Sequence, residues 1–368
     1  MKVLVAGGGT AGHVFPALAL ARWLADEHGA EVRFAGTSTG QEAHLVPEAG
    51  FPFDPVDARP LRRDLSLETL TAPIAAVRSV SECRPLVERA DVVVGMGGYV
   101  SVPVGLAAVR ARRPLVLHEQ NAVPGLANRL LAHRARTVAL AFEEAAARLP
   151  RRSRTVLTGN PVRDRVLAVV AERETLAKEA LAEFELESGR RTLVVFGGSQ
   201  GALHVNAVAV DAIEHLRDRE DLQVLLLTGP AHERRVVDGL AAGPMTVRVR
   251  GFLDRMELAY ALADIVVSRA GATTCAELSV CGLPSILVPY PHATGRHQEA
   301  NARALERAGA ALVLIDRELS GASLASAVSG LLDDPTRLGS MGERMRSWAR
   351  PDAAEALARV VLDAGAPQ

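Results

Sequence analysis

The alternation of short apolar runs with longer segments of helical period constrains the fold of this chain more than any other feature of its sequence. The runs, made mostly of Val, Leu and Ile, occupy residues 3–5, 32–34, 92–94, 115–117, 193–195, 224–227, 265–267 and 285–288. Strands that alternate with helices in this way are typical of parallel sheets built from βαβ units. The composition agrees, because 48% of the residues are apolar and only 4% aromatic, a balance that suits buried parallel strands. We therefore predict an α/β fold rather than a sandwich or a barrel.

The chain is long enough for two domains, and its two halves repeat each other. At 368 residues it exceeds the size at which one hydrophobic core stops growing. The repeated segments begin at Lys2 and Thr192, at Ala90 and Ala263, and at Pro114 and Pro284. Their order and spacing predict two doubly wound Rossmann-like parallel-sheet domains in tandem.

A turn signal at residues 158–161 marks the expected domain boundary, because a charged helical segment at 163–187 follows it. We predict an N-terminal domain over 1–161 and a C-terminal domain over 162–350, facing each other across a cleft. Pro351 interrupts the helical pattern late in the chain. The last helix, within 351–368, is expected to pack back on the N-terminal domain.

Charge and cysteine content exclude several classes of function. The formal net charge is -1 and no long run of one sign occurs, so we expect no nucleic-acid partner. The three cysteines, Cys83, Cys275 and Cys281, match neither a disulfide framework nor a zinc-site spacing. A reducing cytosol is the simplest setting for such a chain.

The sequence predicts neither a signal peptide nor a transmembrane helix. Glycines interrupt the N-terminal apolar run before a signal-peptide core could form, so we expect no export by that route. The uncharged stretch 92–109 reaches the lower length limit of a transmembrane helix. Its glycines instead predict a buried strand followed by a glycine-rich loop.

The loop at residues 7–13 is the first candidate site. Gly7, Gly9 and Gly12 fit the spacing of a dinucleotide-binding loop between a strand and a helix. That fold also needs an acid at the end of the second strand to hold a ribose, and residues 34–38 supply none. The NAD hypothesis thus loses its second support. The loop still favours a phosphate or another anion, unless its glycines only make a tight turn.

The second half carries two comparable loops, at residues 197–201 and 269–274. All three loops follow strands, so their ligands are expected in the crevice at the carboxyl ends of the strands. Glu277 lies one helical turn after Thr273, which puts a carboxylate beside the phosphate donors. The acid either accepts from ribose hydroxyls or only complements the helix dipole.

The motifs taken together resemble those of a known family. They read GGTAGHVFP at 8–16, MGGYVS at 96–101, HEQN at 118–121, GNPVR at 159–163 and GGSQG at 197–201, followed by Glu277. Over nearly its whole length the chain is similar to the MurG family of bacterial peptidoglycan N-acetylglucosaminyltransferases, which have the GT-B fold. The resemblance implies inverting transfer of N-acetylglucosamine from UDP-N-acetylglucosamine to lipid I, which gives lipid II. It also implies a peripheral location on the cytoplasmic membrane face, with other cell-wall synthesis proteins as partners.

The same resemblance implies roles for individual residues. The donor diphosphate would be held by Arg163, Ser199, Ala272, Thr273 and Thr274, the ribose by Glu277, and the uracil by the backbone around Leu253. The donor sugar would be met by Thr10, Ala11, Gly12, Asn121 and Gln298, and the acceptor by Gly9, Gly97, Gly98 and Tyr99.

Two positions depart from the family pattern. Ala11 stands where a glycine usually precedes the loop glycine and histidine, and its methyl group is tolerated only at negative φ. Arg296 stands where similar sequences often carry an acid, and we draw no role from it.

Direct displacement at the sugar needs a base for the acceptor hydroxyl and stabilisation of the departing UDP. His13 is the first candidate base, because an ordinary histidine pKa suits proton removal at neutral pH. Glu119, at the tip of a strand, is the second, although either side chain could instead have a structural role. Helix N-termini and Arg163 would stabilise the diphosphate, so we expect no required metal or cofactor. His292 and His297 lack a third ligand for a zinc site.

A helical segment at 67–80 is the candidate membrane contact. It places Leu67, Leu70, Ile74 and Val77 on one side, near Arg62, Arg63 and Arg78. An interior face packed on the first sheet explains the pattern equally well. Two other functions remain open as well: another UDP-sugar transferase or epimerase with a different acceptor, and a nucleotide-sugar-binding module without catalysis.

Overall fold

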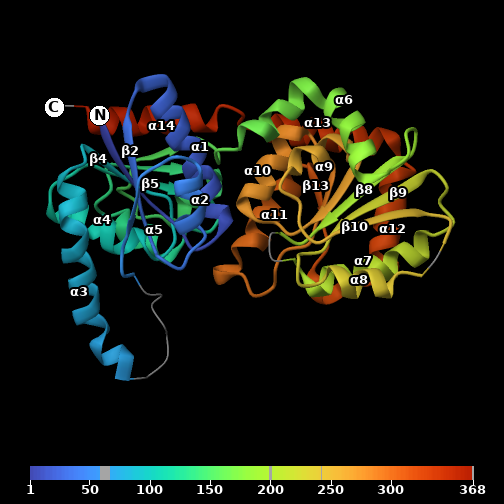
Figure 1. Cartoon of the computed structure of the whole chain (residues 1–368), viewed down its shortest axis with the longest axis horizontal. Helices are drawn as coiled ribbons and strands as arrows, with labels where there is room; N and C mark the ends of the chain where they lie inside the picture. The colour runs from blue at the N-terminus through green and yellow to red at the C-terminus, as the bar shows by residue number, and fades with distance from the viewer. Residues whose placement is uncertain (59–66, 199–200, 242, 367–368) are drawn as a thin grey trace. The chain divides into compact units, whose positions relative to one another are not determined.

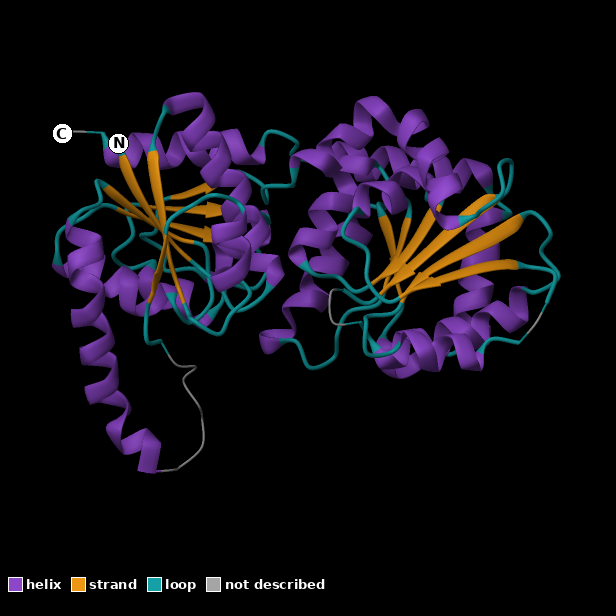
Figure 2. Cartoon of the chain, in the orientation of Figure 1, coloured by secondary structure: helices purple, strands orange, loops and turns teal. Residues whose placement is uncertain are grey.

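The computed structural model describes residues 1–58, 67–198, 201–241 and 243–366, with the backbone alone for residues 11 and 67–77. The chain divides into two compact units (Figure 1). Unit 1 comprises Met1–Arg163 and Arg350–Gln368, and unit 2 comprises Asp164–Ala349. Each unit contains one sheet with helices on both of its faces (Figure 2).

The sheet of unit 1 has the strand order β3-β2-β1-β4-β5-β6-β7, and all its neighbouring strands are parallel. The strands are β1 (Lys2–Ala6), β2 (Glu31–Gly36), β3 (Phe53–Pro55), β4 (Val92–Gly95), β5 (Leu115–Glu119), β6 (Thr137–Leu140) and β7 (Thr155–Leu157). The direction in which the chain adds strands reverses between β1 and β4. Ligands of doubly wound sheets bind at such a point.

The helices of unit 1 cover both faces of this sheet. They are α1 (Ala11–His28), α2 (Glu42–Glu48), α3 (Leu67–Glu88), α4 (Ser101–Arg110), α5 (Leu126–Leu131), the 3-10 helix η1 (Glu143–Arg148) and α14 (Ala353–Gly365). Side chains alternate across a strand, so Val3 and Val5 face α1 and α14 while Leu4 and Ala6 face α3 and α4. The strand is buried on both sides, which explains its continuous apolar sequence.

Helix α14 packs against α1, although nearly the whole chain separates the two helices in sequence (Figure 1). Leu357 and Val361 of this helix are fully buried in the core that contains Val3 and Val5. The end of the chain thus completes the core of the first unit.

The sheet of unit 2 has the order β10-β9-β8-β11-β12-β13 and is also entirely parallel. Its strands are β8 (Arg191–Phe196), β9 (Leu222–Leu227), β10 (Thr246–Arg250), β11 (Ile265–Ser268), β12 (Ser285–Leu287) and β13 (Ala311–Val313). Its central strand β8 occupies the place that β1 has in the first sheet.

The helices of unit 2 are α6 (Asp164–Phe184), α7 (Leu203–Leu216), α8 (Glu233–Gly239), α9 (Met256–Leu262), α10 (Ala272–Cys281), α11 (His297–Arg307), α12 (Gly321–Leu332) and α13 (Pro335–Trp348), with 3-10 helices η2 (Thr294–Arg296) and η3 (Asp316–Glu318). Leu193 and Val195 of β8 share a core cluster with residues of α7, α8, α12 and α13. Helices α9 and α10 begin shortly after the ends of β10 and β11, so their first turns lie at the carboxyl edge of the sheet.

The predicted α/β fold with two parallel-sheet domains is confirmed. The repeated segments of the sequence are equivalent strands, since β1 corresponds to β8 and β4 to β11 in the two sheet orders. The stretch 92–109 forms β4, a loop and most of α4, as the glycines predicted. Within the described part of the chain, no helix is both long and apolar enough to cross a membrane.

Candidate active site

Two glycine loops pack backbone against backbone at the carboxyl edge of the first sheet. One follows β1 and the other follows β4. A Cβ atom on Gly98 would lie 2.7 Å from the carbonyl oxygen of Gly8, and Gly98 has a φ of +77°. A Cβ atom on Gly97 would lie 3.0 Å from the ring of His13. No side chain fits at these positions, so the contact requires both glycines of the 96–101 motif.

The candidate acceptor residues meet in this contact. Gly9 has a φ of +94°, and a Cβ atom there would lie 3.8 Å from the ring of Tyr99. The Ser101 hydroxyl lies 2.7 Å from the Gly97 carbonyl oxygen and 3.1 Å from that of Ala6, and thus links the second loop to the end of β1. The structure therefore places Gly9, Gly97 and Tyr99 together.

His13 lies in the first turn of α1, at the end of the glycine loop. Its Nδ1 atom is 3.1 Å from the hydroxyl of Thr10, the residue that precedes the helix. Helix α1 begins at Ala11, and since helical backbone has negative φ, the methyl group at this position is tolerated. The side chain of Ala11 lies outside the described residues. Thr10, Gly12 and His13 lie together at the start of α1.

Glu42 is a site residue that the sequence analysis missed. Only 1% of it is exposed, and its carboxylate accepts hydrogen bonds from the Gly9 N–H at 2.8 Å, the Thr37 N–H at 2.9 Å and the Thr37 hydroxyl at 2.8 Å. Burial alone would raise the pKa of this carboxyl, but the donors outweigh it and hold the pKa below its ordinary value. Glu42 therefore fixes the glycine loop as a buried anion.

The position of Glu42 also bears on the dinucleotide hypothesis. An acid does follow β2, but its carboxylate is occupied by the loop itself and is not available to a ribose. The sequence offered one signal: Glu42 stands at the start of a helix, five residues after Thr37 and just after the turn that ends at Gly40. Ordinary helix N-terminal acids look the same.

Glu119 ends β5 and organises the next loop. One carboxylate oxygen accepts from the Asn121 N–H at 3.0 Å, and the other accepts from the Gly125 N–H at 3.0 Å and the Asn128 side chain at 2.8 Å. Burial raises the pKa of Glu119, while these donors act in the opposite direction. Both oxygens are thus engaged by the loop that carries Asn121.

The neighbouring His118 joins two of the sequence motifs. Its Nε2 atom lies 3.0 Å from the carbonyl oxygen of Gly159, which lies in the turn after β7. Complete burial lowers the pKa of His118 to about 4, so the ring is neutral at pH 7. Arg163, at the end of the same motif, lies 4.6 Å from the centre of the Phe15 ring on α1. This candidate diphosphate ligand therefore lies beside the helix of the first glycine loop.

In unit 2, the loops after β8, β10 and β11 carry candidate site residues at the carboxyl edge of the second sheet. The loop after β8 is packed so closely that a Cβ atom on Gly201 would lie 2.0 Å from the Thr228 carbonyl oxygen, to which the Asn206 side chain donates at 2.8 Å. Ser199 of this loop lies outside the described residues. Leu253 lies between β10 and α9, and the loop after β11 leads into α10.

Helix α10 supplies the most complete candidate for nucleotide binding. Ala272, Thr273 and Thr274 form its first turn after the extended residue Gly271. The first N–H groups of a helix have no partner within the helix and favour a phosphate. Glu277, only 4% exposed, follows one turn later and accepts from the Tyr260 hydroxyl at 2.8 Å. The sequence analysis missed Tyr260, because nothing local distinguishes it from a core aromatic residue.

Two further side chains frame this edge. Arg269 is 8% exposed and donates to the carbonyl oxygens of Val288 and Pro289, both at 3.2 Å, and to Asp316 at 2.5 Å. It therefore holds the strand ends together rather than facing a phosphate. Gln298, a predicted sugar contact in the first turn of α11, accepts from the Tyr290 N–H at 2.9 Å.

Among the described residues, no three His, Cys, Asp or Glu side chains are grouped as metal ligands. The Nδ1 atom of His297 lies 2.9 Å from the Thr294 carbonyl oxygen, and the ring of His292 packs on Tyr290. Arg296 adopts a positive φ of 54° and its side chain is 79% exposed. It points to solvent.

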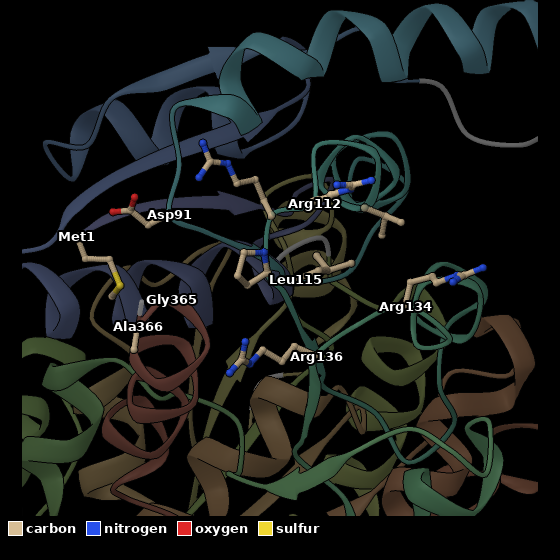
Figure 3. A pocket seen from close by; sticks show the side chains of 11 residues that line it. Met1, Asp91, Arg112, Leu115, Arg134, Arg136, Gly365 and Ala366 are labelled. Carbon is tan, nitrogen blue, oxygen red and sulfur yellow. The ribbon is translucent and has the colours of Figure 1, made fainter. Parts of the chain in front are cut away.

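A pocket of about 890 Å³ opens at the opposite edge of the first sheet, before the starts of β4, β5 and β6 (Figure 3). Four arginines line it, Arg112, Arg113, Arg134 and Arg136. Among the described residues of its lining, Asp91 is the one acid, and its carboxylate accepts from the Lys2 N–H at 2.7 Å. None of the sequence-predicted site residues lies here, and the pocket carries positive charge.

Replacing Glu42 by Gln tests whether a buried anion holds the first glycine loop. The variant leaves buried donors facing an amide, so we expect urea denaturation at pH 7 to give a free energy of unfolding lower by about 2–3 kcal/mol. The folded pKa of Glu42 is lowered, so its contribution is present above the unfolded pKa of about 4.3 and is lost as the pH falls through the folded pKa. The difference from wild type should therefore shrink in acid.

The exposed acid Glu48 on the same helix gives the matched control, and Glu48→Gln should change the free energy of unfolding by less than about 0.5 kcal/mol. Equal stability of Glu42→Gln and wild type at pH 7, or a difference that grows toward acid, contradicts this account of the loop.

Comparisons with known proteins show the family and the fold. Residues 3–140 match the model of the glycosyltransferase family 28 N-terminal domain, and residues 192–357 match that of the C-terminal domain. The structure is similar to a crystal structure of Acinetobacter baumannii MurG, with a TM-score of 0.80 and 29% identity over 98% of this chain and 99% of that one. A Neisseria meningitidis UDP-GlcNAc 2-epimerase, at TM-score 0.70 and 13% identity over 99% and 100%, shares the fold alone.

Two curated relatives carry the name UDP-N-acetylglucosamine--N-acetylmuramyl-(pentapeptide) pyrophosphoryl-undecaprenol N-acetylglucosamine transferase. The protein of Halothermothrix orenii is 40% identical, and that of Desulfitobacterium hafniense strain Y51 is 43% identical. In both cases the similarity covers 99% of this chain and 99% of the relative. The family is thus established over the whole length, and the chain belongs to glycosyltransferase family 28.

Proposed function

We propose that this chain transfers N-acetylglucosamine from UDP-N-acetylglucosamine to lipid I, the undecaprenyl-diphospho-N-acetylmuramoyl-pentapeptide, and so makes lipid II for peptidoglycan. The observation that carries the proposal is the 40% identity, over 99% of both chains, with a relative whose name describes this transfer. The two sets of loops, one in each unit, give the proposal its chemistry.

The donor is assigned to unit 2. The first turn of α10, Ala272–Thr274 in the chain, suits the diphosphate because its N–H groups and the helix dipole favour negative charge. Glu277 would accept from the ribose hydroxyls, and the backbone at Leu253 would meet the uracil. Ser199 and Arg163 complete the assignment for the diphosphate, and Gln298 and Asn121 for the sugar.

His13 is the base that the geometry favours. Both oxygens of Glu119 already accept from the loop that they hold, so using this acid as a base would disturb that loop. If the Nδ1–H of His13 donates to the Thr10 oxygen, the Nε2 atom keeps its lone pair for a proton. We assign proton removal to His13 and a positioning role to Glu119.

The reaction then balances as one displacement. The acceptor hydroxyl oxygen forms a bond to the anomeric carbon while the bond from that carbon to the UDP oxygen breaks, with inversion. His13 takes the hydroxyl proton, and the negative charge that develops on UDP is stabilised by the first turn of α10 and by Arg163.

A lipid acceptor places the enzyme at the cytoplasmic surface of the membrane, as a peripheral protein. The four arginines of the pocket in unit 1 support this assignment, since cationic clusters attract anionic lipid headgroups (Figure 3). Arg78 supports it less, because it pairs with Glu82 at 2.9 Å. The predicted apolar stripe of Leu67, Leu70, Ile74 and Val77, with Arg62 and Arg63, lies outside the described side chains.

A panel of donors tests the function directly. With a soluble lipid I analogue as acceptor, UDP-N-acetylglucosamine should turn over at least about tenfold faster than UDP-glucose in kcat/KM, because a site that binds the acetamido group leaves polar groups unpaired without it. Preference for UDP-glucose excludes this transfer. Conversion of the donor to an isomeric UDP-sugar without acceptor would instead establish an epimerase.

The variant His13→Asn tests whether His13 removes the proton. His13→Asn should lower kcat by about 100-fold or more and leave the UDP dissociation constant and the melting temperature close to wild type. His44→Asn, at an exposed position on α2, is the control and should retain full activity. If His13→Asn keeps wild-type kcat, the proton goes elsewhere and the assignment fails.

A further inference from the structure

Tyr260 is buried at the candidate nucleotide site, and nothing in the family motifs assigns it a role. The residue is 1% exposed, and its hydroxyl donates to Oε2 of Glu277 at 2.8 Å. Glu277 is itself 4% exposed. A hydrogen bond to a carboxylate is stronger than one between neutral groups, and a low local dielectric strengthens it further. The bond therefore restrains the orientation of the Glu277 carboxylate.

The Tyr260 ring is held as firmly as its hydroxyl. Phe196 meets it edge to face, with ring centres 6.1 Å apart, which is a favourable arrangement of aromatic rings. Helix α9, which carries Tyr260, also packs along α6. Because the ring is packed in place, its hydroxyl fixes the direction from which the Glu277 carboxylate accepts this hydrogen bond.

The same ring joins the three segments to which nucleotide contacts are assigned. Phe196 is the last residue of β8, directly before the glycine loop at 197–201. Helix α9 begins at Met256, just after the loop that contains Leu253. Glu277 lies in α10, one turn after the residues assigned to the diphosphate. Tyr260 therefore contacts the elements on either side of the carboxylate that would meet the ribose.

We propose that Tyr260 is a positioning residue for ribose recognition: it holds one oxygen of Glu277 so that the carboxylate accepts from a hydroxyl of the UDP ribose. This inference rests on the proposed function, in which Glu277 meets the ribose. It predicts that discrimination between ribose and deoxyribose depends on a residue that does not itself touch the sugar.

The experiment compares the dissociation constants of UDP, 2′-deoxy-UDP and 3′-deoxy-UDP by calorimetry for wild type, Tyr260→Phe and Glu277→Gln. Tyr260→Phe should weaken UDP binding by roughly fivefold to tenfold and leave binding of the relevant deoxy analogue nearly unchanged, so that their ratio falls toward one. In the transfer assay its KM for the donor should rise by a similar factor, with kcat within about twofold of wild type.

Thr192→Val is the matched control for the loss of a buried hydroxyl. Thr192 is 1% exposed at the start of β8, at the opposite edge of the same sheet, and its hydroxyl accepts from the Gln223 side chain at 3.0 Å. It should lower the melting temperature without changing the ratio of UDP to deoxy-UDP affinity. A change of the ratio in this control would mean that any loss of stability produces the effect, and would overturn the inference.

The variants also separate failure of the inference from failure of the proposed site. If Glu277→Gln abolishes the discrimination and Tyr260→Phe preserves it, Tyr260 does not position the acid, although the ribose assignment stands. If Glu277→Gln preserves the discrimination, the ribose assignment itself fails. Should Tyr260→Phe not fold, Glu277→Asp withdraws the carboxylate from the hydroxyl by one methylene and keeps its charge, and unchanged discrimination in that variant overturns the inference.

Discussion

Backbone at the carboxyl edge of each sheet is packed too closely to admit side-chain carbons, and the candidate site depends on this constraint. In unit 1 a Cβ atom on Gly98 would lie 2.7 Å from the carbonyl oxygen of Gly8, and in unit 2 one on Gly201 would lie 2.0 Å from the Thr228 carbonyl oxygen. Because all strand pairs are parallel, every loop that follows a strand meets this edge. Glycines there leave N–H groups and helix first turns near a ligand, which suits polyphosphates and sugars.

Such loops need internal anchors, and buried carboxylates supply them. Glu42 accepts from the first glycine loop, Glu119 accepts from the loop after β5, and Glu277 accepts from Tyr260. Glu119 is the last residue of β5, Glu42 and Glu277 lie in the helices that follow β2 and β11, and all three acids are almost fully buried. Burying an anion is costly unless donors surround it, so each site is a fixed arrangement of donors around one charge. Both units thus have buried carboxylates at the carboxyl edge of the sheet. Glu277 differs from the other two acids because it is assigned to bind a ligand.

The local sequence pattern predicted the central strands and the glycine loops, but not the edge strands or the long-range hydrogen bonds. The central strands were predicted because their apolar runs are buried on both faces, whereas the edge strands β3, β7 and β13 have three residues each and β10 alternates arginines with valines. Glycine spacing located the loops. Glu42 and Tyr260 were missed because Gly9, which Glu42 anchors, lies 33 residues from it, and Glu277 lies 17 residues from Tyr260. Both pairs meet only after helices pack on the sheets. Glu119 was found, but its pattern of hydrogen bonds favours a structural role over the base first considered.

Hydrogen exchange with and without UDP shows which unit binds the nucleotide. Amides in the first turn of a helix exchange readily unless a ligand accepts from them, because they lack partners within the helix. If UDP binds unit 2 as proposed, the largest slowing of exchange should occur in residues 271–277 and 251–256. Residues 7–14 should exchange as in the unliganded enzyme. Greatest protection of residues 7–14, with no change at 271–277, would contradict the account.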